Sequence, residues 1–251
     1  MKRITVILIL GALLALGLTL GDASWLGPGL GQADEEQPPD LMAYWKFDEG
    51  GGEGITDETA NHNDGTIYGP KWVEGKSGYA LQFDGVDDYT EVPDSDSLDL
   101  AEGFTIAAWI NLAEVGKGRQ ALLQKKVPGE SDVFTDYTFY VQWTADLLAL
   151  VIGDGERRVG ALSDRGLGAA GGWHHVAVTF SKEEGEVRFY IDGEFAGATD
   201  ITLSPHTNNG PLLIGRYTSG MTPKFHLKGT IDELRIYSRA LTDKEIKELL
   251  Q

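Results

Sequence analysis

The sequence contains no cysteine among its 251 residues. A disulfide framework is therefore excluded, and so is attachment of a lipid through a cysteine thioether. If this protein works outside the cell, its stability must come from core packing or from a bound metal ion.

Basic residues are scarce: 21 lysines and arginines stand against 39 aspartates and glutamates, so the formal net charge is -18 at pH 7. Affinity for a phosphate backbone depends on clustered positive charge, and this balance argues against nucleic acid as a partner. An acidic surface is also typical of soluble proteins, of cation-rich surroundings and of carboxylates gathered around divalent ions. Charge alone does not separate these three.

A long apolar run occurs once, from Ile4 to Leu20, directly after Lys2 and Arg3. A basic start, an apolar stretch and small residues after it are typical of a signal peptide, with cleavage after Ala23 or after Ala33. An uncleaved membrane anchor is the alternative, because the run is at the lower limit for a bilayer span. We expect an exported protein, secreted or in the cell envelope or periplasm, with no membrane span in the mature chain.

The rest of the chain is interpreted as a short linker followed by one domain. We assign residues 1–33 to the signal peptide and the segment after it, 34–40 to a charged linker with two prolines, and 41–251 to a single folded domain. Hydrophobic residues make up 41% of the chain, enough to bury one substantial core. All-β domains of more than about 200 residues are often single units.

Short strands separated by turns dominate this domain. Glycine accounts for 33 residues without a collagen period, which indicates many tight turns. Asp192-Gly193 lies between alternating runs and predicts a β-hairpin. A helix is expected at 242–250, where Thr242 and Glu245 form a capping-box pattern. We expect strands at 42–47, 65–68, 79–83, 89–92, 104–110, 121–125, 137–143, 147–152, 173–180, 187–191, 195–198, 212–214 and 229–237.

This pattern predicts an all-β fold, a two-sheet antiparallel jelly-roll sandwich with a short C-terminal helix. No alternation of helices and strands suggests a parallel sheet.

Landmarks in a fixed order give the domain a resemblance to a known family. They are Ala43-Tyr-Trp-Lys-Phe-Asp48, Asn61-His-Asn-Asp-Gly-Thr66, Ala80-Leu-Gln-Phe-Asp-Gly-Val-Asp-Asp-Tyr89, Phe104-Thr-Ile-Ala-Ala-Trp-Ile110, Gly172-Trp-His-His-Val-Ala-Val178, Tyr190-Ile-Asp-Gly193, Leu213-Ile-Gly-Arg216 and Gly229-Thr-Ile-Asp-Glu-Leu-Arg-Ile-Tyr237. Residues 41–251 thereby resemble a LamG-like jelly-roll domain. The resemblance implies the concanavalin A-like fold, which lectins, laminin G modules and laminarinase-type glycosidases share.

The last predicted strand carries a carboxylate, Asp232, with the same parity as Leu234 and Ile236. Residues two apart line one face of a strand, so this alternation predicts that Asp232 points into the core. A buried carboxylate without a partner is costly, and a cation, a cluster of backbone N–H groups or a paired base could each meet it.

The resemblance implies that the acidic loop from Asp57 to Gly65 meets the start of the last strand and that together they hold a structural calcium ion. The predicted ligands are the side chains of Asp57, Asn61 and Asp232 and the carbonyl of Gly65, since calcium takes oxygen ligands from such loops. In the alternative interpretation, Asp57 and Asn61 are turn formers, and Asp232 accepts hydrogen bonds from backbone N–H groups.

A catalytic pair is not evident in the sequence. Laminarinase-type enzymes place a nucleophile and an acid on one strand, but Ile231-Asp232-Glu233 lacks the flanking carboxylates of that pattern. His174 and His175 are neighbours on one strand, point to opposite faces and are interpreted as structural. The acidic turn that contains Asp84, Asp87 and Asp88 is interpreted as turn chemistry, with metal binding by the three carboxylates as the alternative. We predict no catalytic residues and no enzymatic activity.

Aromatic, amide and guanidinium side chains near predicted loops are candidates for ligand contact. We predict Trp143, Arg157, Asn208 and Tyr217 as ligand-binding residues, because small-ligand sites combine apolar platforms with a few polar groups. Core packing of Trp143 and turn chemistry of Asn208 are the alternatives.

The sequence therefore predicts an exported, calcium-stabilised, noncatalytic domain that recognises a glycan or a glycosylated or extracellular protein. An adhesion or structural module that binds protein is one alternative to glycan recognition, and a glycoside hydrolase of the same fold is the other.

Overall fold

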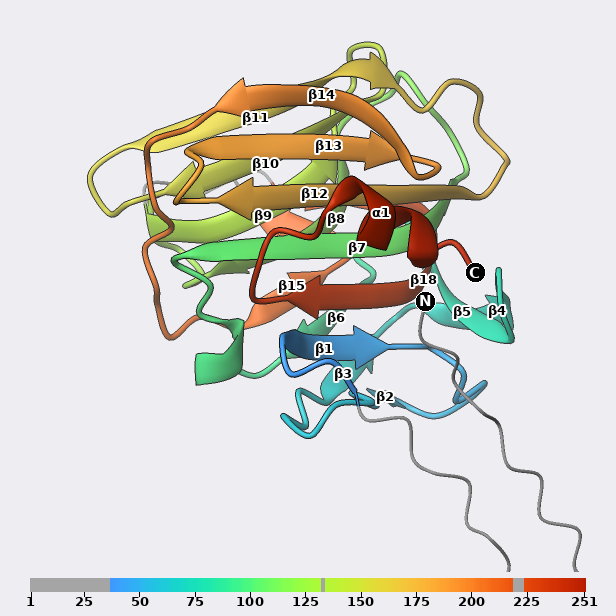
Figure 1. The fold of residues 1–251 in the computed structure, drawn as a ribbon. Coiled ribbons are helices and arrows are strands. Elements are labelled where there is room, and N and C mark those ends of the chain that lie inside the picture. The colour runs from blue at the N-terminus through green and yellow to red at the C-terminus, as the bar shows by residue number, and fades with distance from the viewer. Residues whose placement is uncertain (1–36, 132–133, 219–223) are drawn as a thin grey trace, which may run out of the picture. The chain divides into compact units, whose positions relative to one another are not determined.

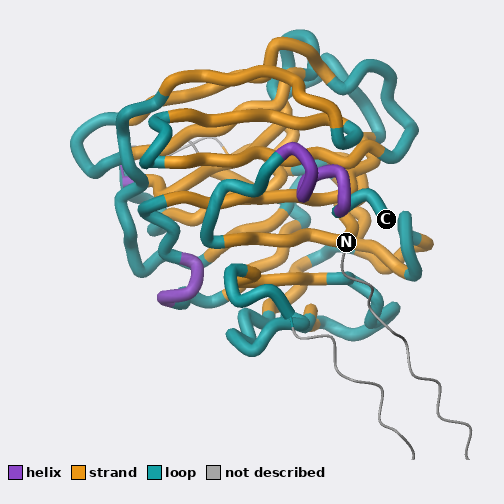
Figure 2. Tube along the Cα trace, viewed as in Figure 1, coloured by secondary structure: helices purple, strands orange, loops and turns teal. Residues whose placement is uncertain are grey.

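Two antiparallel β-sheets, packed face to face, form the domain in a computed structural model that describes residues 37–131, 134–218 and 224–251 (Figures 1 and 2). Residues 37–251 form one compact unit. The predicted signal peptide and the start of the predicted linker lie outside the described residues. Within the described ranges, no helix combines the length and apolar character needed to cross a bilayer.

The first sheet, sheet A, has eight strands and carries the C-terminal helix on its outer face (Figure 1). In spatial order the strands are β14 (Glu194–Asp200), β13 (Glu186–Ile191), β12 (His174–Ser181), β7 (Gly103–Leu112), β18 (Lys228–Tyr237), β5 (Tyr79–Asp84) and β4 (Lys71–Glu74), with β1 (Leu41–Trp45) also paired to β18. The helix, α1 (Asp243–Glu248), buries Ile246 against Ala107, Ala177 and Tyr190.

The second sheet, sheet B, also has eight strands, and a two-stranded hairpin packs on it. The order is β11 (Arg158–Gly166), β10 (Leu147–Gly153), β9 (Thr135–Val141), β8 (Gln120–Lys126), β15 (Leu212–Ile214), β6 (Tyr89–Val92), β3 (Gly65–Tyr68) and β2 (Gly54–Ile55). The hairpin consists of β16 (Arg216–Thr218) and β17 (Lys224–His226), and a 3-10 turn spans Asp96–Leu98.

The core lies between the two sheets and follows the period of two along each strand. Val176 and Val178 of β12 contribute from sheet A, and Leu148 and Leu150 of β10 contribute from sheet B. All four side chains are fully buried. The prediction of a two-sheet all-β sandwich with one C-terminal helix is confirmed.

The strongest local signals in the sequence predicted a hairpin turn and the start of the C-terminal helix. Asp192 and Gly193 both have positive φ and join β13 to β14, as a two-residue hairpin turn requires. Thr242 caps α1: its backbone N–H donates to Glu245 Oε2 at 2.8 Å, and its hydroxyl accepts from the Glu245 backbone N–H at 3.4 Å. The hairpin and the capping box are both confirmed.

Five of the observed strands were not predicted from the sequence: β2, β4, β11, β16 and β17. Most of them are only two to four residues long, too short to show an alternating pattern. The nine-residue β11 was missed for another reason. It is the edge strand of sheet B, and exposed charged residues such as Asp164 and Arg165 interrupt its apolar positions.

The prediction that Asp232 points into the core is wrong, because β18 contains a bulge. Ile231 lies opposite Ile110 in the core, so Asp232, opposite Trp109, must face outward from the sandwich. Glu233 then adopts a φ of 53° and shifts the register, which returns Leu234 to the core. Asp232 nevertheless has no exposed surface, because other parts of the chain cover it.

Candidate functional site

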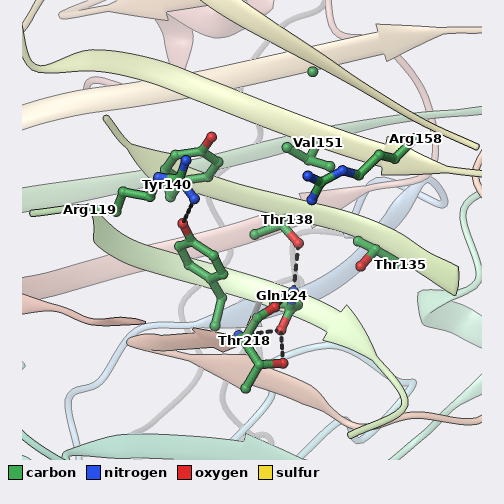
Figure 3. A pocket seen from close by; sticks show the side chains of 10 residues that line it. Arg119, Gln124, Thr135, Thr138, Tyr140, Val151, Arg158 and Thr218 are labelled. Carbon is green, nitrogen blue, oxygen red and sulfur yellow. Dashed lines mark hydrogen bonds between the residues drawn. The ribbon is translucent and has the colours of Figure 1, made fainter. Parts of the chain in front are cut away.

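A hollow of about 240 Å³ lies on the face of sheet B that is turned away from the core (Figure 3). Its walls come from β8, β9, β10, β11 and the hairpin strand β16. The described residues that line it are Arg119, Gln124, Thr135, Thr138, Tyr140, Val151, Arg158, Gly160, Tyr217 and Thr218. Sugar and other small-ligand sites typically measure about 300–1,000 Å³, so this hollow suits one ring-sized group.

Cross-strand register places several of these side chains in one row. Gln124 of β8 lies opposite Thr138 of β9, Thr138 lies opposite Val151 of β10, and Val151 lies opposite Gly160 of β11. Opposed residues share a face of the sheet, so the side chains of Gln124, Thr138 and Val151 all point away from the core. Gly160 presents no side chain, which leaves open space at the β11 end of the row.

The amide of Gln124 fixes the hairpin to the sheet. Its Nε2 donates to the Thr138 hydroxyl at 2.9 Å and to the Thr218 carbonyl at 3.0 Å, and its Oε1 accepts from the Thr218 backbone N–H at 2.9 Å (Figure 3). Gln124 thus pairs with Thr218 as a neighbouring strand would. Both ends of the amide are satisfied, and the edge of the hollow is preorganised.

Aromatic rings and a guanidinium group form one wall. The rings of Tyr140 and Tyr217 lie 5.1 Å apart, and Tyr217 also stacks on Phe225 of β17 at 4.8 Å. Arg119 donates to the Tyr217 hydroxyl at 3.0 Å and lies over the rings of Tyr140 and Phe225. Burial raises the pKa of Tyr140, against the opposing charges of Arg119 and Arg158, so its phenol stays protonated and able to donate.

The polar groups of the hollow are donors and neutral hydroxyls. Arg158 reaches in from the start of β11, beside Thr135 and Thr138 (Figure 3). Among the described lining residues there is no aspartate, glutamate, histidine or lysine. The described wall can therefore orient hydroxyl-bearing or anionic groups, but it offers no pair of carboxylates for acid-base chemistry.

One of the four predicted ligand-binding residues lines this hollow, namely Tyr217, which is 3% exposed. Trp143 is 58% exposed in the turn after β9, so the alternative of core packing is wrong, yet it lies outside the lining. Arg157 precedes β11 and pairs with Asp154 at 3.2 Å, also outside the lining. The next residue, Arg158, lines the hollow instead.

Asn208, the fourth predicted residue, belongs to a buried polar network. Its amide donates to Asp136 at 2.8 Å and to the Phe134 carbonyl at 3.0 Å, and its oxygen accepts from the Gly210 backbone N–H at 2.8 Å. The last bond is the turn chemistry that the alternative interpretation expected. The backbone carbonyl of Asn208 also accepts from the fully buried ammonium of Lys125 at 2.8 Å, so Asn208 has a structural role.

The predicted calcium ligand Asp57 is surrounded by hydrogen-bond donors. Its two carboxylate oxygens accept from the backbone N–H groups of Tyr44, Thr59 and Asn63 at 2.9–3.0 Å and from the Thr59 hydroxyl at 2.8 Å. Asn61 is exposed and donates to the Met42 carbonyl at 2.9 Å. These contacts satisfy Asp57 without a cation and fit the turn interpretation.

Asp232 lies against a different loop. Its Oδ2 accepts from the backbone N–H groups of Lys76 at 2.7 Å and Ser77 at 3.0 Å, whereas its Oδ1 is buried and has no hydrogen-bond partner among the described residues. Burial raises the pKa of Asp232 to about 6 despite the two N–H groups. None of its hydrogen bonds joins it to the loop from Asp57 to Gly65, the carbonyl of Gly65 included. Calcium binding stays a prediction.

A protein-family model matches most of this chain. The model of the concanavalin A-like lectin/glucanase superfamily matches residues 84–247. The chain belongs to this superfamily. Members of such a broad superfamily share a fold and differ in function, so the site has to carry the functional argument.

Solved structures agree with this concanavalin A-like fold. Domain 4 of AbnA, a GH43 extracellular arabinanase from Geobacillus stearothermophilus solved in complex with arabinotriose, has a TM-score of 0.65 at 23% identity, covering 84% of this chain and 98% of that one. The binding domain of botulinum neurotoxin DC in complex with SialylT has a TM-score of 0.60 at 13% identity, covering 84% and 51%. At these identities the likeness shows the fold alone.

Sequence similarity to curated proteins is confined to a short stretch. The Sushi, von Willebrand factor type A, EGF and pentraxin domain-containing protein 1 of Mus musculus is 30% identical over 83 residues, which is 31% of this chain and 2% of that protein. The rat protein of the same name is 29% identical over 83 residues.

Sequence reasoning missed Arg119, Gln124 and Thr138 as functional candidates. Thr138 and Gln124 occupy outward positions on strands that were correctly predicted, but an outward polar residue on a strand is commonplace. Their shared position depends on the order of the strands in sheet B, which no local pattern in the sequence encodes.

Proposed function

We propose that this chain is an exported, noncatalytic binding domain that recognises a glycan through the hollow on the outer face of sheet B. The observation that carries the proposal is the combination of a tyrosine wall with hydroxyl, amide and guanidinium groups in one ring-sized space. Sugar rings offer apolar faces and a rim of hydroxyls, and such a site matches both features.

The noncatalytic part of the proposal rests on the described lining. Hydrolysis of a glycosidic bond generally needs two carboxylates about 5–10 Å apart, and the described lining residues supply none. The groups present can hold and orient a ligand. Recognition therefore suits this site better than bond cleavage.

The relatives support a binding role outside the cell without fixing the ligand. One structural neighbour is a domain of an extracellular arabinanase bound to arabinotriose, and others are toxin binding domains, one in complex with SialylT. Together with the signal-peptide pattern at residues 1–33, they favour a secreted or cell-envelope protein.

We further propose that Asp232 helps to hold a structural calcium ion. Its buried Oδ1 lacks a partner, and an unpartnered carboxylate oxygen in a buried site fits a cation. Asp48 approaches the same turn, accepting from the Tyr79 backbone N–H at 2.9 Å, and is the second residue that would contribute. Calcium there would join the segment after β1 and the bulge of β18 to the turn before β5 and stabilise the fold.

The proposed glycan site can be tested with two neighbouring arginines. Binding to arabinotriose, cellotriose, laminaritriose and sialyllactose would be measured by calorimetry for the wild type, Arg158→Ala and Arg157→Ala. Both variants remove one positive charge at the start of β11, but only Arg158 lines the hollow. We expect Arg158→Ala to weaken binding about tenfold or more, through lost hydrogen bonds of about 1.5–3 kcal/mol, and Arg157→Ala to change it less than about twofold.

Equal losses in both variants would show that general surface charge explains the binding and would refute this site. Binding of none of the four sugars on this panel or on a wider glycan array would refute glycan recognition. Release of reducing sugar from the same oligosaccharides would show that the chain is an enzyme.

A further inference from the structure

Three loops meet at one end of the sandwich, and we call them the tip. They are residues 113–118 after β7, the turn 142–146 after β9 and residues 167–172 after β11, the last of which lies at the right of Figure 1. Trp143 lies in the turn and is 58% exposed. It does not line the hollow on sheet B. The tip therefore carries a large apolar side chain that neither the core nor the candidate glycan site uses.

The turn that carries Trp143 is held by both neighbouring loops. The carboxylate of Asp146 accepts from the Gly116 backbone N–H at 2.7 Å, and the Asp146 carbonyl accepts from the Leu167 backbone N–H at 3.2 Å. Ala145 and Asp146 have φ values of 59° and 52°, a conformation that costs free energy in residues other than glycine. The contacts with the two loops keep the turn in this strained form, so Trp143 is presented on a preorganised support.

The surface around Trp143 is almost free of charge. The exposed residues of the three loops are Ala113, Gly116, Lys117, Gly118, Trp143, Thr144, Ala145, Gly168, Ala169, Ala170, Gly171 and Gly172, and Lys117 carries the only charge among them. The tip has two carboxylates, and both are half-buried: Asp146 is bonded as above, and Glu114 pairs with Lys228 at 3.4 Å. In a chain with 39 acidic and 21 basic residues, an end without an exposed carboxylate departs from the general charge balance.

This chemistry fits a lipid surface better than a protein partner. Protein interfaces carry about one hydrogen bond per 100–200 Å², yet residues 168–172 offer only glycine and alanine side chains. Lipid phosphates repel carboxylates and attract lysine, and the indole ring favours the boundary between headgroups and acyl chains. An uncharged surround lets the indole enter that boundary without the cost of removing water from charged groups.

We propose that the tip is a membrane-docking surface that places Trp143 in the interfacial region of a lipid bilayer. The glycine and alanine loops would lie flat on the headgroups, and the Lys117 side chain, 76% exposed, would reach a lipid phosphate. One aromatic anchor gives reversible binding, weaker than the affinity of about 10⁴ M⁻¹ that a single myristoyl chain provides. The tip shares no residue with the lining of the hollow on sheet B, so either site can fail without the other.

The test measures co-sedimentation with phosphatidylcholine vesicles at millimolar lipid. Residues 37–251 are used, a compact unit with its own core, because the apolar run at residues 4–20 would bind lipid by itself. Trp143→Ala is compared with Tyr79→Ala, which removes a 49% exposed aromatic side chain of β5, outside the tip.

A second pair of variants adds one negative charge at either end of the sandwich. Ala169→Asp places it on the tip, and Thr202→Asp places it in the loop after β14, which the strand pairings from β7 to β14 put at the opposite end. All four substituted side chains are exposed, so the melting temperatures should stay close to that of the wild type.

We expect Trp143→Ala to lower the partition coefficient about tenfold or more and Ala169→Asp about threefold or more, because the first loses the buried indole and the second repels the phosphates. Tyr79→Ala and Thr202→Asp should each change it less than about twofold. With 5-fluorotryptophan in the protein and a nitroxide-labelled lipid in the vesicles, the fluorine resonance of Trp143 should broaden, and that of the buried Trp45 should not.

Three results would overturn the membrane-docking surface. The first is a wild type that does not sediment with the vesicles, and the second is equal binding of Trp143→Ala and Tyr79→Ala. The third is self-association in analytical ultracentrifugation that Trp143→Ala abolishes, without binding to vesicles, since it would make the tip an interface between copies of this chain.

Discussion

Replacement of His175 by leucine should make the stability of the protein less sensitive to acid, without cost at neutral pH. His175 of β12 has no exposed surface, and neither ring nitrogen has a hydrogen-bond partner among the described residues. Its ring packs edge-on against Trp109. A buried imidazole without partners contributes its packing but loses the hydration of both nitrogens.

The pKa of His175 gives the sign and size of the acid effect. Burial, together with the positive charge of Arg235, lowers this pKa from 6.5 to about 4. As pH falls below 6.5, His175 becomes protonated in the unfolded chain but stays neutral in the folded protein. The free energy of unfolding therefore falls until about pH 4. Between about pH 7.5 and about pH 4.5 this difference amounts to roughly 2–3 kcal/mol.

The assay is urea unfolding of the wild type and His175→Leu at several pH values across that range. Raised carboxyl pKa values, such as about 8 for the buried Asp136, act in the opposite direction, and the difference between wild type and variant cancels them. We expect His175→Leu to match or exceed wild-type stability at neutral pH, and its advantage to grow by roughly 2–3 kcal/mol by about pH 4.5.

The neighbouring His174 provides a matched control. It is half-buried, and its Nδ1 lies 2.9 Å from Asp192, so His174→Leu removes a hydrogen bond and should reduce stability at neutral pH. This control should keep the acid sensitivity that His175 confers. If the difference between the wild type and His175→Leu does not change with pH, or if His175→Leu is the less stable at neutral pH by more than about 2 kcal/mol, the reasoning is refuted.

Three further predictions concern buried charged groups. If Asp232 holds calcium, EDTA should lower the melting temperature by roughly 5–10 °C, and Asp232→Ala should abolish this response; an unchanged melting temperature in the wild type would contradict the calcium site. Asp57→Ala should cost about 3 kcal/mol or more in calorimetry, equally with and without EDTA, because three buried N–H groups lose their acceptor, and a cost that disappears in EDTA would instead make Asp57 a ligand. Lys125→Ala should cost about 3–5 kcal/mol in urea unfolding, since it removes the buried ammonium that donates to Asp94 at 2.6 Å and to the backbone carbonyls of Asn208 and Gly210 at 2.8 and 3.1 Å. Lys125→Met, which keeps most of the side-chain packing, should recover only part of that loss; full recovery would show that packing alone explains it.

The fold was predictable because its signals are local. Alternating runs such as Val187–Ile191 mark strands, Asp192-Gly193 marks a hairpin turn, and Thr242 with Glu245 marks the start of a helix. Each signal depends on residues within a few positions of one another. The same locality explains the wrong prediction for Asp232. The prediction assumed an unbroken alternation from Asp232 to Leu234, but a bulge at Glu233 interrupts it, and a bulge depends on the pairing of β18 with β7.

The candidate site was less predictable, and particular residues show why. Tyr217 was identified as a ligand candidate and lines the hollow, but Arg157 was chosen where Arg158 is the residue that faces it. Adjacent strand residues point to opposite faces, so an error of one position changes the answer. Asn208 was chosen for its chemistry, but the structure places that amide in the buried network around Lys125.

By itself, the sequence determined the all-β sandwich, the C-terminal helix, the acidic surface and the absence of disulfides. The tertiary structure alone decided which side chains share a surface: Gln124, Thr138 and Arg158 meet around the hollow, and Tyr68 stacks on Tyr89. The physical reason is that strand formation depends on neighbours along the chain, whereas a binding surface depends on the order and register of strands far apart in it. That order arises only when the two sheets form and pack around a common core.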